Sequence, residues 1–196
     1  MTPIRYPDDE SVEEITARYL LSVATEPLPV LYGFHYDGAT VHAECVRVDF
    51  SRDRGPDEPN PIHVHAAKLR TVLGPGMFGF GFVFVVFADQ LAYRPANRHI
   101  PQQVRRAAER LPGATDLLVA ATIDATGRQW WAVAPRHLPE LDPVCLRLPA
   151  LDPADWSLPE SLDSSLWTAA LALDDANHAP LLRLRSAAPP CTGSTR

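Results

Sequence analysis

Residues 29–50 read PVLYGFHYDGATVHAECVRVDF, and they decide the fold of the N-terminal half. Asp37-Gly38 stands between two runs of alternating residues. This dipeptide is a strong short-range signal for a β-hairpin, because a type I′ turn needs positive φ at both central positions. We expect Tyr36 to pair with Ala39, which would gather the aromatic and aliphatic side chains on one face. The opposite face would then carry His35, His42 and Glu44.

The flanking segments supply a helix and a central strand. Residues 11–24 have apolar side chains at helical spacing, and Ser11 with Glu14 three residues later fits a capping box. Residues 77–88, MFGFGFVFVVFA, are apolar on both faces, as a central strand covered on two sides must be. We expect Phe78, Phe80 and Phe82 to share one face. A helix of twelve residues is too short to cross a bilayer, which takes about 20.

Later residues continue the alternation of helices and strands. Residues 101–111 predict a second helix, and a second hairpin is expected around residues 124–127. The stretch 62–74 is compatible with a short helix or with a strand that runs into one. Proline recurs at short intervals beyond Arg136, which is typical of an extended wrapping segment or a linker.

These elements predict an α+β fold with a mixed or antiparallel sheet of about five strands, centred on residues 77–88, and two packed helices. We expect a core domain over residues 1–136. A Pro-rich extension with one helix, packed on the core or on a partner, follows over 137–185, and residues 186–196 are expected to be a disordered tail.

Composition excludes some classes of protein. The formal net charge of −6 disfavours nucleic-acid binding as the main activity, since phosphate binding needs concentrated Lys and Arg. The N-terminus is acidic rather than of the secretory type, and three widely spaced cysteines favour reduced thiols, so we expect a cytoplasmic protein without a membrane segment. Of 18 basic residues 17 are Arg, which indicates a GC-rich, bacterial genome.

His42-Ala43-Glu44 has the His-x-Glu spacing of zinc deaminases. Such a site also needs a later Pro-Cys-x-x-Cys. Pro190-Cys191 is the sole Pro-Cys pair, and Ser194 stands where the second Cys belongs. The metal shell would be incomplete, so the sequence argues against deaminase chemistry.

Two other ligand sets remain open. His35, His42 and Glu44 are expected on one side of the hairpin, and two imidazoles with a carboxylate can hold zinc with a fourth position for water. His63 and His65 are a second candidate pair, and they would share a side only if they lie in a strand. Solvent-facing hairpins and loop borders also carry His and Glu, so the sequence favours a solvated surface over a metal site for both patterns.

The order helix, hairpin, His-x-His, strand, helix, hairpin resembles that of JAB/MPN metalloproteases. The resemblance implies that Glu44 activates water and that His63 and His65 bind zinc. It fails at the next position, because no Ser-x-x-Asp follows His65 and the first acid after it is Asp89. An alternative alignment sets residues 87–90 at the ligand positions and implies an inactive site.

No complete catalytic set emerges. We therefore expect a non-enzymatic protein-binding or assembly module of a cytoplasmic bacterial system, without a cofactor, that binds a protein partner or itself. Candidate contact residues are Trp130, Trp131, Trp167, Arg105 and Arg106. The alternative is a zinc-dependent, JAB/MPN-like hydrolase that uses Glu44 with the histidines named above.

Overall fold

The chain folds into six strands and three helices within the residues that the structure describes. It is a computed structural model that describes residues 4–49, 60–74, 76–88, 100–111, 115–138 and 140–150. The elements are α1 (Asp9–Ser22), β1 (Val30–Tyr36), β2 (Val41–Arg47), α2 (Pro61–Leu73), β3 (Met77–Phe87), α4 (Gln102–Ala108), β4 (Asp116–Asp124), β5 (Gln129–Pro135) and β6 (Val144–Leu148).

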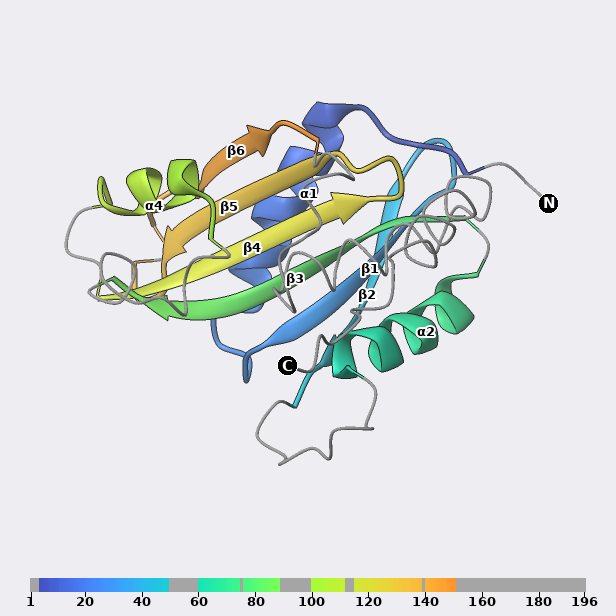
Figure 1. The fold of residues 1–196 in the computed structure, drawn as a ribbon, viewed down its shortest axis with the longest axis horizontal. Helices are drawn as coiled ribbons and strands as arrows, with labels where there is room; N and C mark the ends of the chain where they lie inside the picture. Colours follow the sequence, from blue (N-terminus) through green and yellow to red (C-terminus); the bar gives the residue numbers. More distant parts are fainter. Residues whose placement is uncertain are drawn as a thin grey trace, which may run out of the picture.

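All six strands form one sheet in the order β2-β1-β3-β4-β5-β6, and every neighbouring pair is antiparallel (Figure 1). The fold is therefore α+β, as expected, with six strands instead of five. Strand β3 lies inside the sheet, as its apolar sequence predicts, next to β4. Strands β2 and β6 form the two edges.

Two hydrophobic cores lie on opposite faces of the sheet. Helix α1 covers one face and contacts β4, β5 and β6, while α2 lies over β1 and β2 on the other, where α4 covers β5 and β6 (Figure 1). Trp130 and Trp131 are consecutive on β5, so they enter different cores, and each is only 1% exposed. Burial of such large side chains on both faces is the main stabilisation of a layered fold.

The predicted hairpin is confirmed, but its register differs by two residues. Tyr36 pairs with Val41 instead of Ala39, and His35 lies directly opposite His42. Because side chains alternate with a period of two, a shift of two residues leaves every side chain on its expected face.

The side chain of Asp37 causes this shift. Its Oδ1 accepts hydrogen bonds of 2.8 Å from the N–H groups of Ala39 and Thr40, and its own N–H donates to the Thr40 carbonyl. The turn therefore spans residues 37–40, with Gly38 at φ 104°. The two central residues of the observed turn are thus Gly38 and Ala39, one position later than the predicted Asp37 and Gly38.

Phe78 does not share a face with Phe80 and Phe82, contrary to expectation. It packs in the core beneath α1, whereas Phe80 and Phe82 pack on the opposite face. The pairing of β1 with β3 shifts at this end, where Phe34 faces Gly79 but His35 faces Met77. Such an irregularity reverses the alternation locally.

Helices α1 and α2 begin at residues whose side chains cap them. Asp8 caps α1 by accepting a 2.7 Å hydrogen bond from the N–H of Ser11, so the cap lies three residues before the predicted one. Residues 61–73 form a helix, and Asn60 caps it through a bond from the N–H of Ile62. Helix α4 is shorter than the predicted 101–111.

Strand β6 is a further departure from the sequence prediction. Residues 144–148 pair with β5 as the sixth strand, although the prolines around them indicated a linker or a wrapping segment. Pro143 and Pro149 flank the strand without interrupting its hydrogen bonds. The helix expected within 151–185 and the tail 186–196 lie outside the described residues, as does Trp167. No helix in the described ranges is both long and apolar enough to span a bilayer.

Candidate functional site

The hairpin brings His35 and His42 together, with ring centroids 6.1 Å apart. Nε2 of His42 lies 3.0 Å from Oδ2 of Asp37. This hydrogen bond, followed by those from the N–H groups of Thr40 and Ala39, holds the pKa of the Asp37 carboxyl well below its usual range. His42 is thus engaged by the turn carboxylate rather than by Glu44.

The other two members of the predicted hairpin site have separate surroundings. Glu44 lies opposite Gly33 in the register and is exposed. The ring of His35 lies against residue 76, because a Cβ built on Gly76 would stand 2.0 Å from Nε2 of His35. Nε2 of His35 therefore lies close to the backbone at Gly76.

His63 and His65 lie in α2, where residues two apart face different directions. His63 is exposed, whereas Nδ1 of His65 is buried and has no hydrogen-bond partner among the described residues. Burial lowers the pKa of His65, and the charge of Lys68 lowers it further. Within the described parts of the chain, no three His, Cys, Asp or Glu side chains gather in a way that could hold a metal ion.

The remaining predicted contact residues are dispersed. Arg105 and Arg106 lie in the last turn of α4, Arg106 exposed and Arg105 half-buried. Trp130 and Trp131 belong to the two cores, as described above.

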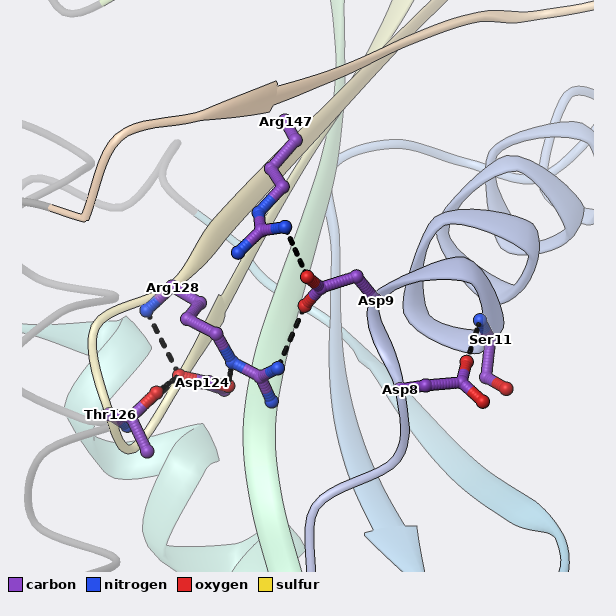
Figure 2. A network of polar contacts seen from close by, with 7 residues as sticks. All are labelled: Asp8, Asp9, Ser11, Asp124, Thr126, Arg128 and Arg147. Carbon is purple, nitrogen blue, oxygen red and sulfur yellow. Dashed lines mark hydrogen bonds and ion pairs between the residues drawn. The ribbon is translucent and has the colours of Figure 1, made fainter.

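A polar network that the sequence did not predict joins α1 to the β4–β5 turn and β6 (Figure 2). The carboxylate of Asp124 is completely buried, and its Oδ1 accepts bonds from the N–H and hydroxyl of Thr126 and the N–H of Arg128. Nε of Arg128 donates to Oδ2 of Asp124 across 2.7 Å. Nη1 of Arg128 donates to Asp9 across 2.7 Å, and Arg147 pairs with the other Asp9 oxygen.

This network is structural. Two carboxylates and two guanidinium groups balance in charge, and every oxygen of Asp124 has a partner, so neither Asp9 nor Asp124 is left as a free acid or base. Arg128 and Arg147 also line an open hollow of about 280 Å³ with Leu148, Pro149 and Ala150. It is smaller than the roughly 300–1,000 Å³ of ordinary ligand pockets.

The buried titratable groups do not form a catalytic set either. Burial raises the pKa of Tyr32 to about 12 and that of the Cys145 thiol to about 11. Cys45 is exposed, yet burial of its sulfur, with Glu44 nearby, raises its pKa too. A nucleophilic thiol needs a depressed pKa, which neither cysteine has.

The outer edge of β2 presents backbone groups that no strand of the described ranges pairs with. The N–H of Val48 donates to the Pro29 carbonyl, and that of Asp37 donates to Thr40. Hydrogen-bonded and non-hydrogen-bonded pairs alternate along an antiparallel ladder. With both end pairs bonded, His42, Glu44 and Val46 are the β2 residues whose backbone groups bond to β1. The backbone N–H and C=O groups that point away from β1 are those of Val41, Ala43, Cys45 and Arg47.

Strand β2 has few of the devices that protect an edge: it carries the charged Glu44 and Arg47, both exposed. It has no proline, no lysine and no register shift against β1. Val41, Ala43 and Cys45 offer small or apolar side chains on the face of α1, and His42 and Glu44 lie on the other face. No strand pairs with this edge among the described residues.

Within the described residues the geometry defines a class, an α+β protein with an antiparallel six-stranded sheet in which β2 is an edge strand. Comparison with known protein families, curated proteins and solved structures finds no match to this chain. The resemblance to JAB/MPN metalloproteases thus has no support beyond element order.

Proposed function

We propose that the protein is a non-enzymatic protein-binding or assembly module, and that its contact element is the outer edge of β2. The observation that carries this proposal is the row of outward-facing backbone groups from Val41 to Arg47, which have no strand beside them in the described part of the chain. A partner segment in extended conformation would pair with them as a seventh strand.

Energetics favour this mode of binding. Each backbone hydrogen bond contributes about 0.5–1.5 kcal/mol net, so several bonds along β2 support a specific contact. Neighbouring apolar side chains add to it. Helix α2 covers β1 and β2 and exposes Val64 and Val72, the latter 70% accessible, at the same end of the sheet. A partner that extends the sheet can bury such residues.

Site-specific photo-cross-linking in the native host tests the proposal. A photoreactive residue is introduced in place of Cys45, whose side chain is exposed at the edge, and the matched control carries it in place of Glu13, exposed on α1. We expect covalent adducts with a protein chain from position 45 and none from position 13. Equal yields from both positions, or no adduct from position 45, would contradict the proposal.

A further inference from the structure

We infer that the strand that β2 takes up is β2 of a second copy of this chain, so that two sheets join across a twofold axis at Ala43. This inference rests on the proposed function, because it names the partner of the same edge. It starts from the finding that Val41, Ala43 and Cys45 direct their backbone groups outward. A twofold axis would set the outward backbone groups of β2 in one copy against the same groups in the second copy.

Side-chain complementarity selects the register among the symmetric antiparallel pairings centred on His42, Ala43 and Glu44. With the axis at Glu44, two carboxylates would face each other, and with the axis at His42, two imidazoles would. With the axis at Ala43, His42 of each copy lies opposite Glu44 of the other, twice by symmetry. An imidazole can donate a hydrogen bond to a carboxylate across paired strands, whereas two carboxylates directly opposite each other are unfavourable. All three registers pair outward backbone groups of the two copies, and the axis at Ala43 is the one that also sets each imidazole opposite a carboxylate.

The side chains on the other face of β2 are also compatible with this pairing. Val41 lies opposite Cys45 of the second copy, and the two Ala43 residues lie opposite each other. No charge meets an apolar side chain in these pairs. Ala43 forms a hydrogen-bonded pair with its copy, which implies a Cα–Cα distance of about 5.5 Å.

That distance permits a disulfide, since bridged cysteines have Cα atoms roughly 4.4–6.8 Å apart. In a full-length chain in which Cys45, Cys145 and Cys191 are replaced by Ala, Ala43→Cys is expected to give a covalent dimer on mild oxidation. Glu13→Cys in the same background is the control and is expected to stay monomeric. A dimer yield from Ala43→Cys no higher than the control overturns the inference.

Sedimentation equilibrium of the reduced, unlabelled chain gives an independent readout. The wild type should approach twice the 21.6 kDa of one chain as its concentration rises. Ala43→Pro removes the outward N–H of each copy without touching the β1 ladder and should raise the dissociation constant about tenfold or more. Glu44→Lys replaces the His42–Glu44 attraction and should weaken the dimer about tenfold at low salt, while Glu13→Lys should not.

The outcomes separate the inference from the proposed function. If the chain is monomeric at every concentration while position 45 cross-links to a different protein, the second copy is excluded and the binding edge stands. If Glu44→Lys leaves the dimer unchanged, the axis does not lie at Ala43. If position 45 captures no protein and the chain is monomeric, both proposals are wrong.

Discussion

Asp124 and Arg128 form a buried ion pair that closes the β4–β5 turn, with Nε of Arg128 2.7 Å from Oδ2 of Asp124. Asp9 accepts a hydrogen bond from the same guanidinium group, so Arg128 also holds the start of α1 against the sheet. Removal of one partner from a buried ion pair leaves the other charge without compensation, which is far more costly than loss of an exposed pair.

Asp124→Ala should therefore lower the free energy of unfolding by about 3 kcal/mol. Arg128 retains its ion pair with Asp9 in this variant, but the amides of Thr126 and Arg128 lose their acceptor. Urea denaturation followed by circular dichroism measures this change. Glu14→Ala, which breaks the exposed Glu14–Arg18 pair, is the control and should cost less than about 0.5 kcal/mol. Equal losses in the two variants would show that the network adds no special stability.

The Asp37 carboxylate makes the hairpin sensitive to acid. Its folded pKa is lower than the unfolded value of 3.8, so its stabilisation is present above about pH 4 and disappears as the pH falls through the folded pKa. Asp37→Asn cannot titrate, and its stability should fall less than that of the wild type between pH 5 and pH 2. Parallel pH profiles for both proteins would contradict this assignment.

Two glycines of the sheet should differ in their tolerance of a methyl group. A Cβ at Gly79 would lie 2.7 Å from the Ile123 carbonyl oxygen, which belongs to rigid backbone. A Cβ at Gly33 would lie 2.7 Å from Cε of Met77, the end of a flexible side chain. Gly79→Ala should destabilise by about 2–3 kcal/mol and Gly33→Ala by roughly 1 kcal/mol, as measured by thermal unfolding. A larger destabilisation by Gly33→Ala than by Gly79→Ala would show that the backbone near Ile123 adjusts more easily than the side chain of Met77.

Metal analysis tests the alternative function, a zinc-dependent hydrolase. Since His42 bonds to Asp37 and the two histidines of α2 face apart, protein purified without a His tag should contain far less than one equivalent of zinc, and chelation should leave its melting temperature unchanged. Elemental analysis decides this. One equivalent of zinc that disappears on His42→Ala or His63→Ala would restore the hydrolase as the leading function.

The sequence predicted the order and type of most elements because periodicity and turn residues are local signals. It did not predict β6, since a strand at a sheet edge with prolines beside it has little local pattern and depends on pairing with β5. The hairpin register was wrong by two because Asp37 bonds to backbone amides, which alternation does not reveal. Phe78 was placed on the wrong face because bulges interrupt the period of two.

The candidate site was harder to predict than the fold. The His and Glu residues suggested metal binding, but their ligand geometry depends on register and helix direction. In the Asp9–Arg128–Asp124 network, Asp9 lies more than a hundred positions from Arg128, and no sequence pattern indicates that such distant residues meet. The one local indication is Asp124 two residues before Thr126, which favours an Asx turn. The open edge of β2 emerges only from the strand order.

Amide hydrogen exchange by NMR tests the edge most directly. In dilute protein, the outward amides of Ala43 and Cys45 should exchange quickly, while the inward amides of Glu44 and Val46, bonded to β1, stay protected. At high concentration, or with the cross-linked partner added, Ala43 and Cys45 should become protected as well. Protection of Ala43 and Cys45 already in the dilute monomer, or fast exchange under every condition, would contradict an edge that binds a protein strand.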